Sequence, residues 1–358
     1  MSQERLIPWQ SLSVLSTCGG LLLCLTGCPG PAVDDDDDPS PADIELVCDR
    51  DYYPAVKELV EGAEESIVAA QWEYFASPST NRLIAILSEA SERGVDVRVL
   101  LDEAMEENHT AVSRFQTYGV EAALDNSTNR KVHAKMLVVD GQRAIVGSTN
   151  WSWAALDDNR ECNIVLRAGQ GPAYLGTWFE QLWSDSSVRD APSLSQDDGL
   201  PGRVFVNDDL LPLLLAKIDA AESSIDFTLY ATYLQPDNLG APSMQVFGAL
   251  ANAANRGLAV RGVADFTDWN PANNDSNQEA VSWLRERGIE MRWDDPDSNM
   301  HAKVFRIDQG LQVQTANVST SGFSTNHEAG IWTEDSTVIS NAQDWFDGLW
   351  EESTHIRP

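Results

Sequence analysis

The apolar residues of the chain recur at helical spacing and then at strand spacing, and this pattern occurs twice. Each copy begins with four apolar residues at i, i+3, i+4 and i+7, a spacing that predicts the buried face of an amphipathic helix. They are Val56, Leu59, Val60 and Ala63 in the first copy, and Leu211, Leu214, Leu215 and Ile218 in the second. A strand is expected after each helix.

A second helical pattern follows in the first copy. Its apolar positions are Leu83, Leu87 and Ala90. The helix is predicted to stop at Gly94, a suitable C-terminal cap. The next strand is predicted from the branched residues Val95, Val97 and Val99. Because helices alternate with strands, we expect an α/β fold whose sheets are covered by helices.

Longer segments also return in the same order and at nearly the same offset. Residues 63–75, 94–103, 119–126 and 178–183 resemble residues 221–233, 257–266, 288–295 and 345–350. The folded part is therefore predicted to be two copies of one unit, at residues 44–190 and 200–358. The tryptophan-rich segments at 178–183 and 345–350 are predicted to be core residues of a closing helix.

The N-terminal region has the composition of an export signal. An apolar segment from Leu12 ends in Leu25-Thr26-Gly27-Cys28, and small residues before a cysteine resemble the lipobox of bacterial lipoproteins. We predict a signal peptide at residues 1–28, a lipid on Cys28, and anchoring to the bacterial cell envelope, on its periplasmic or outer-membrane face. A plain secretory signal is the nearer alternative, and an uncleaved membrane helix the more distant one, because the segment is short and interrupted.

Residues 29–43 are predicted to form a solvated tether between the lipid and the folded part. They contain prolines and five consecutive aspartates, Asp34 to Asp38, which cannot build a core. Of the five cysteines, Cys18 and Cys24 would leave with the signal, so that only Cys48 and Cys162 remain beside Cys28. The sequence leaves open whether this last pair forms a disulfide or two buried thiols.

The composition is that of a globular protein with an acidic surface. The chain has 358 residues, of which 42% are hydrophobic, enough for one large domain or two ordinary ones. With 24 Lys and Arg against 56 Asp and Glu, the formal net charge is -32. This charge opposes binding to nucleic acid phosphates, although a locally basic cleft remains compatible with it. We interpret the acidity as an adaptation for solubility in a salty or extracellular medium.

The candidate chemistry lies in two apolar stretches that each carry a histidine and a lysine two residues apart. The first stretch has His133, Lys135 and Asp140, and the second has His301, Lys303 and Asp308 at the same spacing. An asparagine follows each stretch, Asn150 and Asn317, and a glutamate comes eleven residues after each asparagine, Glu161 and Glu328. A single His-x-Lys pair is a weak indication, whereas two with the same companions are a strong one.

These residue types suit the cleavage of a phosphodiester. Residues i and i+2 of a strand face the same side, so the histidine and lysine of each copy can reach one ligand. Lysine and asparagine side chains neutralise and hydrogen-bond the non-bridging oxygens of a phosphate. A neutral imidazole can attack phosphorus while a protonated one gives its proton to the leaving oxygen, and the glutamates would orient the two rings.

The spacing His-x-Lys, four residues, Asp, six residues, Gly-Ser-x-Asn resembles the motif of the phospholipase D superfamily, and residues 133–150 match it throughout, including Gly147 and Ser148. The resemblance extends over the chain from about residue 44. It implies two tandem α/β/α units related by a pseudo-twofold axis, a covalent phosphohistidine, and no metal or cofactor. It also implies that His133 is the nucleophile and His301 the general acid, and that Asp140 and Asp308 serve the structure.

The second copy departs from this motif. It has Thr315-Ala316-Asn317 in place of Gly-Ser-x-Asn, one residue closer to its aspartate than in the first copy. Asn317 and the hydroxyl of Thr315 remain available for contacts with phosphate oxygens. The shift raises the alternative of a degenerate copy that binds phosphate without catalysis.

The substrate is predicted to be a phospholipid headgroup, with phosphatidyl transfer to alcohols as an additional reaction. An exported acidic protein favours a headgroup over a long polyanion. The alternatives are an exported, metal-independent endonuclease and a non-catalytic phosphate-binding module. Basic residues near the first motif would serve the endonuclease: Arg130, Lys131, Arg143 and Arg160. The sequence leaves the oligomeric state open.

Overall fold

The computed structural model describes residues 42–196 and 202–357, which belong to one compact unit. The predicted signal peptide, Cys28 and nearly all of the predicted tether lie outside the described residues. Within the described part, no helix is long and apolar enough to cross a membrane.

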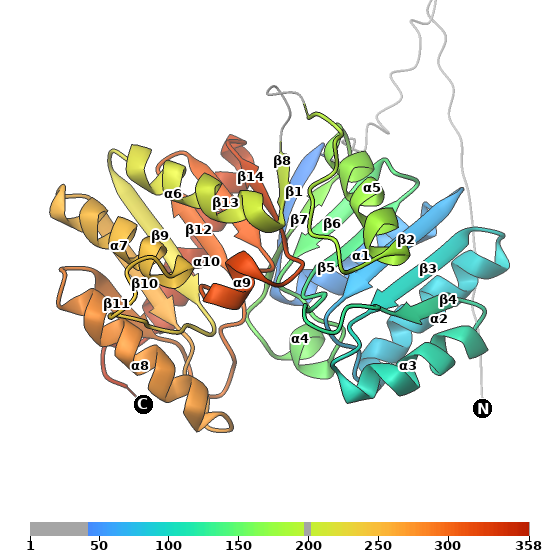
Figure 1. The fold of residues 1–358 in the computed structure, drawn as a ribbon, viewed down its shortest axis with the longest axis horizontal. Coiled ribbons are helices and arrows are strands. Elements are labelled where there is room, and N and C mark those ends of the chain that lie inside the picture. The colour runs from blue at the N-terminus through green and yellow to red at the C-terminus, as the bar shows by residue number, and fades with distance from the viewer. Residues whose placement is uncertain (1–41, 197–201, 358) are drawn as a thin grey trace, which may run out of the picture. The chain divides into compact units, whose positions relative to one another are not determined.

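The first half of the described chain builds one seven-stranded mixed sheet with the strand order β1-β7-β6-β5-β2-β3-β4 (Figure 1). Strands β2, β3 and β4 are parallel to one another, and the remaining pairs are antiparallel. Its elements are β1 (Ile44–Cys48), α1 (Tyr52–Glu61), β2 (Ser66–Gln71), α2 (Pro78–Glu92), β3 (Asp96–Leu101), α3 (Glu106–Thr117), β4 (Glu121–Leu124), β5 (Lys135–Val139), β6 (Arg143–Gly147), α4 (Trp153–Asp157), β7 (Cys162–Leu166) and α5 (Gly171–Ser184).

The second half repeats this topology strand for strand, in the order β8-β14-β13-β12-β9-β10-β11. Its elements are β8 (Arg203–Val206), α6 (Leu210–Ala220), β9 (Ser224–Leu229), α7 (Pro242–Asn255), β10 (Ala259–Ala264), α8 (Pro271–Arg285), β11 (Glu290–Trp293), β12 (Val304–Ile307), β13 (Gly310–Gln314), α9 (Thr320–Ser324), β14 (Ala329–Thr333) and α10 (Ser336–Glu352). The predicted α/β fold of two tandem units is therefore confirmed.

The predicted helix boundaries agree closely with the structure. The second predicted helix lies within α2, and Gly94 directly after its C-cap has φ of +95°, the left-handed conformation that ends many helices. The first predicted helix corresponds to α1, but α1 ends at Glu61, so that Ala63 is buried beyond the helix end.

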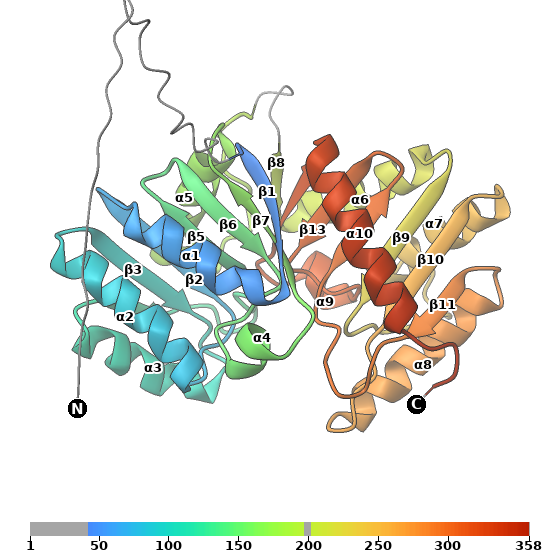
Figure 2. The same cartoon turned by 180° about the vertical axis from the view of Figure 1, so that it is seen from behind.

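The apolar residues form one core in each half and a third core between the two sheets. Alternate residues of β2 enter different cores, with Ile67 in the outer core beneath α1 and α2, and Val68 in the central core. The central core also takes Trp178 from α5 and Phe346 from α10, which confirms the closing helices predicted from the tryptophan-rich segments. Figure 2 shows α10 across the second sheet, and it also contacts β1 of the first.

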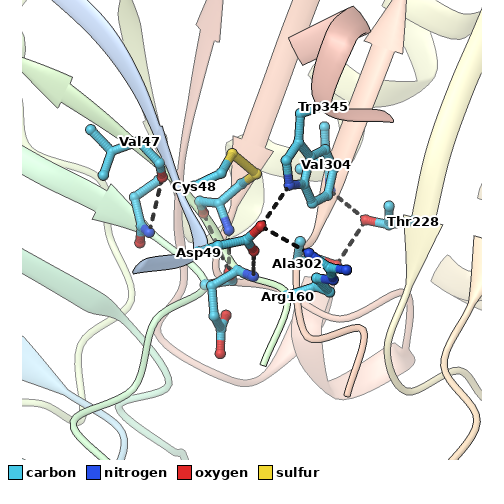
Figure 3. Close-up of a disulfide and its surroundings, with 12 residues drawn as sticks. Val47, Cys48, Asp49, Arg160, Thr228, Ala302, Val304 and Trp345 are labelled. Atoms are coloured by element: carbon cyan, nitrogen blue, oxygen red, sulfur yellow. Dashed lines mark hydrogen bonds and ion pairs between the residues drawn. A yellow bond between two sulfur atoms is a disulfide. The ribbon is translucent and has the colours of Figure 1, made fainter. Parts of the chain in front are cut away.

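A disulfide joins Cys48 and Cys162, which face each other on the adjacent strands β1 and β7 with their Cα atoms 4.1 Å apart. The structure thus decides the question that the sequence left open. In the second half the same pair of positions holds Val206 and Ala329. Figure 3 shows that the disulfide lies beside Asp49, which accepts a hydrogen bond of 3.2 Å from the indole of Trp345.

We expect the disulfide to stabilise the fold by closing a long loop, since 114 residues separate its two cysteines. The double variant Cys48→Val with Cys162→Ala copies the pair found in the second half, and it should lower the free energy of unfolding by about 2–5 kcal/mol. Urea unfolding with and without dithiothreitol measures this. The reductant should lower the stability of the native protein and leave that of the variant unchanged, and equal stabilities without reductant would contradict the prediction.

Candidate active site

The two predicted histidines meet at one cavity. His133 lies just before β5 and His301 just before β12, and both line a cavity of about 510 Å³ together with Asn150. An aromatic ring packs beside each imidazole, Trp72 at 5.4 Å from the ring of His133 and Tyr230 at 4.3 Å from that of His301, measured between ring centres. The pseudo-symmetry of the two sheets therefore extends to the cavity that lies between their ends.

Each imidazole is paired with the glutamate of the opposite half. The Nδ1 atom of His133 lies 2.9 Å from the Glu328 carboxylate, and that of His301 lies 2.9 Å from the Glu161 carboxylate. Both glutamates are fully buried. Since a carboxylate accepts and does not donate, each ring holds its proton at Nδ1 and presents Nε2 to the cavity. Neither half contains a complete histidine–glutamate pair of its own.

Two asparagines that sequence analysis did not select fix the glutamates. The Nδ2 group of Asn159 donates to Glu161 at 3.1 Å, and that of Asn326 donates to Glu328 at 3.0 Å. Thr315 adds a hydrogen bond of 2.5 Å from its hydroxyl to Glu328. The signal in the sequence that could have identified them is the Asn-x-Glu pattern, which is repeated at residues 159–161 and 326–328.

Burial keeps both imidazoles uncharged in the protein alone. It lowers the pKa of His133 to about 4, although the neighbouring Glu328 acts in the opposite direction. Burial lowers the pKa of His301 to about 4 in the same way, against the effect of Glu161. A bound phosphodiester anion would raise the pKa of the imidazole that it touches, so that one ring can take up the proton that a general acid needs.

The two motif lysines are buried directly behind the histidines. Each Nζ donates a hydrogen bond to the backbone carbonyl of the histidine two residues earlier, from Lys135 to His133 at 2.7 Å and from Lys303 to His301. Burial lowers the pKa of Lys135 to about 8 and that of Lys303 to about 7. Both are therefore cations whose charge depends on the pH near neutrality.

The motif asparagines have capacity left for a ligand. Asn150 stands two residues after Ser148, and Asn317 two residues after Thr315. The side-chain oxygens of both asparagines are buried and have no hydrogen-bond partner among the described residues. Asn150 lines the cavity, whereas Asn317 is half-buried and does not appear among the lining residues. The structure thus brings Asn150 to the cavity wall, whereas its predicted counterpart Asn317, three residues beyond β13, is not part of that wall.

The second motif is one residue shorter than the first because its hairpin turn is one residue shorter. Val139 pairs with Arg143 across β5 and β6, so that residues 140–142 form the first turn. Ile307 pairs with Gly310 across β12 and β13, so that only residues 308–309 form the second. The shortening therefore lies at the far end of the strands from the cavity.

Thr315 consequently takes the position of Ser148. The backbone N–H of Ser148 donates to Cys162 at 3.0 Å, and that of Thr315 donates to Ala329 at 2.8 Å. Both hydroxyls accept a hydrogen bond of 3.0 Å from the backbone N–H of that same facing residue. The departure inferred from the sequence is therefore confined to the turn and to one residue before Thr315.

That residue is Gln314, which stands where the first copy has Gly147. A side chain at Gly147 would come within 2.5 Å of Asn163, its partner on β7. In the second half the glycine is on the opposite strand, because Gln314 pairs with Gly330 of β14. At this pair of facing strand positions each half therefore has one glycine and one larger residue.

The aspartates of the two motifs lie at the hairpin turns, away from the cavity. Asp140 accepts backbone N–H groups of residues 64–66, and Asp308 accepts those of residues 222–224. Both have positive φ, 54° and 49°. They hold the turn against the start of the neighbouring strand β2 or β9.

Two further carboxylates, which the sequence analysis did not single out, position the chain that enters each motif. Asp102 accepts the backbone N–H of Val132 at 2.5 Å, and Asp265 accepts that of Met300 at 3.0 Å. Burial raises the pKa of both aspartates to about 7. Both lie in the repeated segments 94–103 and 257–266, which was the only indication of them in the sequence.

Among residues 42–196 and 202–357, no group of three or more His, Cys, Asp or Glu side chains is arranged to hold a metal ion. Of the basic residues near the first motif, Lys131 lies over the ring of Trp72 at the cavity, 4.5 Å from the ring centre, whereas two arginines are engaged elsewhere. Arg143 pairs with Asp140, and Arg160 pairs with Glu352 and lies 3.5 Å from Asp49.

We expect kcat/KM for a p-nitrophenyl phosphodiester, whose leaving group needs no general acid, to fall as the pH rises above about 7. The protonated lysines are the forms that neutralise phosphate, and they lose their protons at pKa values of about 7 for Lys303 and about 8 for Lys135. In Lys303→Arg the cation persists at higher pH, so the fall should begin only with the loss of the Lys135 proton.

A profile of kcat/KM between pH 5 and pH 10 measures this effect. The control is Lys217→Arg, at a lysine that pairs with Glu334 on the surface, and it should leave the profile unchanged. An alkaline limb that stays in place in Lys303→Arg and in Lys135→Arg would show that other groups cause it.

Comparison with curated proteins gives relatives named cardiolipin hydrolase, cardiolipin synthase and phospholipase D. A family model described as "Cardiolipin synthase, PLD-like domain" matches residues 56–183 and 214–350. The mitochondrial cardiolipin hydrolase of Mus musculus is 29% identical over 112 residues, which are 31% of this chain and 49% of that protein, so the chain spans about half of that relative. The probable cardiolipin synthase YwiE of Bacillus subtilis is 24% identical over 346 residues, 86% of this chain and 66% of that protein.

A solved structure shares the whole arrangement. The crystal structure of a phosphatidylserine synthase from Haemophilus influenzae superposes with a TM-score of 0.69 at 12% identity, over 88% of each chain. At this identity the likeness concerns the fold. The family model, by contrast, covers both halves and includes both histidine–lysine motifs. This chain therefore belongs to the phospholipase D superfamily, in the family described as cardiolipin synthase, PLD-like domain.

Proposed function

We propose that this protein is a phosphodiesterase of the phospholipase D type that acts on phospholipid headgroups through a phosphohistidine intermediate. The observation that carries the proposal is the crossed pair of imidazoles, each held by a buried glutamate of the other half on one cavity wall. The names of the relatives, cardiolipin hydrolase and cardiolipin synthase, support a phospholipid as the substrate.

The first step forms a bond between phosphorus and the Nε2 atom of His133. The hydrogen bond from Nδ1 to Glu328 leaves the Nε2 lone pair free for this attack. The bond from phosphorus to the headgroup oxygen breaks, and protonated His301 gives its Nε2 proton to that oxygen. Glu161 stabilises the charged form of His301 before the transfer.

The second step regenerates the histidine. Neutral His301 takes a proton from a water molecule, whose oxygen attacks phosphorus and displaces Nε2 of His133. The products are the free headgroup alcohol and a phosphatidate. An alcohol in place of water would give a new phosphatidyl ester by the same steps, which is the transfer reaction that we include in the proposal.

We also propose that the protein is exported and lipid-anchored through Cys28, on the basis of the predicted signal peptide. The disulfide between Cys48 and Cys162 supports an oxidising compartment. Incorporation of a labelled fatty acid tests the anchor directly. It should occur in the native chain and be absent in Cys28→Ser.

The activity is tested with residues 41–358, which contain the whole compact unit that the structure describes. We expect release of headgroups from mixed phospholipid vesicles in the presence of EDTA, and its loss in His133→Ala. Added ethanol should yield phosphatidylethanol if transfer occurs. DNA is offered in a parallel assay, and cleavage of DNA without headgroup release would replace the proposal by the endonuclease alternative. Binding of phosphate without any turnover would leave the non-catalytic module.

A further inference from the structure

Two exposed tryptophans stand at the mouth of the cavity, one from each half. Trp153 is 53% exposed and Trp269 is 65% exposed, and both line the cavity that contains His133 and His301. Trp153 is the first residue of α4, and Trp269 follows β10. Large apolar rings in contact with water are unfavourable for an isolated soluble protein, so their position at this mouth calls for a partner.

The structure fixes the ring of Trp269 by a hydrogen bond and the backbone of Trp153 by a helix cap. The indole N–H of Trp269 donates to Asn299 at 3.1 Å, and Asn299 in turn donates to Asn159 at 3.3 Å. Trp153 begins a helical turn whose N-cap, Ser152, accepts the backbone N–H of Ala155 at 3.3 Å. Asn299, Asn159 and Ser152 also line the cavity, so both tryptophans are attached to residues of the cavity wall.

The residues that line the cavity favour a partner of low net charge over a polyanion. Among the residues that line it there is no lysine and no arginine, and Glu73 is the only carboxylate. The cations close to it are the two buried motif lysines, which serve a single phosphate, and Lys131 over the Trp72 ring. The second half has Ala231 at the position of Glu73, so this carboxylate is present in the first half alone. With a net charge of -32 the chain also lacks the general attraction on which nucleic acid binding depends.

We propose that Trp153 and Trp269 form a docking surface for a zwitterionic lipid bilayer, and that they seat the cavity mouth on the headgroup layer. Tryptophan is the side chain best suited to this boundary, because its ring is apolar and its N–H is polar. The proposal rests on the proposed function, since docking there brings a headgroup phosphate to His133 and His301. The attraction is apolar, and the acidity of the chain disfavours strongly anionic bilayers.

Binding is measured first, with the His133→Ala variant of residues 41–358, so that lipid is not consumed. Cosedimentation uses phosphatidylcholine vesicles and, separately, phosphatidylglycerol vesicles at low salt. Replacing both tryptophans by alanine should weaken binding to phosphatidylcholine by at least about tenfold. Replacement by phenylalanine should have a smaller effect. The matched control is Tyr118→Ala, at an aromatic residue that is 48% exposed and lies on α3's C-terminal end, outside the cavity.

Activity is measured next, with the intact motifs and two substrates of the same headgroup. One is phosphatidylcholine in vesicles, and the other is a short-chain phosphatidylcholine below its critical micelle concentration. The double tryptophan variant should lower the ratio of kcat/KM for vesicles to that for monomers by at least about tenfold. Circular dichroism confirms that each variant is folded.

Three results for the double tryptophan variant would overturn the docking surface. They are equal losses of kcat/KM on vesicles and monomers, unchanged binding to phosphatidylcholine vesicles, or a loss of binding to single-stranded DNA with vesicle binding intact. The failure of the proposed function is distinct from these. In that case the protein with intact motifs turns over neither substrate, while the vesicle binding assay still decides whether the tryptophans contact lipid.

Discussion

Replacing His301 by alanine should nearly abolish headgroup release but spare the first step on a p-nitrophenyl phosphodiester, whereas His133→Ala should abolish both. The nitrophenolate leaves without a proton, so a general acid is not needed for its departure. The nucleophile, in contrast, is needed for every substrate. On phospholipid we expect each replacement to lower kcat/KM by at least about 10⁴-fold.

The kinetics of the nitrophenyl ester distinguish the two histidines, which are nearly equivalent by symmetry. His301 also activates the water of the second step, so His301→Ala should release a burst of up to one nitrophenolate per protein molecule and then slow down. Mass spectrometry of the stopped reaction should find the phosphoryl adduct on His133. The reverse pattern would exchange the two roles, and the absence of a burst in both variants would contradict a covalent intermediate.

Exchanging the glutamates for glutamines should produce effects that cross between the halves. Glu161 accepts from His301 and Glu328 from His133, each at 2.9 Å. Glu161→Gln should therefore reproduce the nitrophenolate burst of His301→Ala, and Glu328→Gln should slow the first step. We expect losses in kcat/KM of roughly 10²- to 10³-fold, because the amide keeps the shape but removes the charge that supports a protonated imidazole.

The same burst experiment measures these variants. Glu334→Gln is the control, since this exposed carboxylate pairs with Lys217 outside the cavity and should leave both steps unchanged. If Glu161→Gln instead acted on the first step and Glu328→Gln on the second, each glutamate would serve the histidine of its own half, and the crossed arrangement would be wrong.

The fold and the composition of the site were predictable because the apolar pattern and the motif residues occur twice at nearly equal spacing. A single His-x-Lys pair on an apolar strand has many explanations, but His133 and His301 share their companions at equal spacing. The crossing of the glutamates was not predictable. Glu161 and Glu328 stand at the same place in their own copies, and spacing within a copy says nothing about which half each carboxylate faces across the central core.

Other features depended on strand register, which the sequence did not supply. Cys48 and Cys162 form a disulfide because they stand directly opposite each other on β1 and β7. The shortened second motif raised the alternative of a degenerate copy, whereas the register of β12 and β13 places the missing residue in the turn at 308–309. The supporting asparagines Asn159 and Asn326 were not predicted, although they stand two residues before the glutamates in both copies. Their role depends on hydrogen bonds to these glutamates, which spacing alone does not show.

The exchange of glutamates between the halves has a consequence for how such a chain changes over time. A single unit could complete its imidazole–carboxylate pairs only with a second, identical copy, and every substitution would then appear on both sides of the cavity. Once the units are fused, each side changes alone. Glu73 opposite Ala231, and the disulfide of one half opposite Val206 and Ala329 of the other, are differences that only a fused duplicate can acquire.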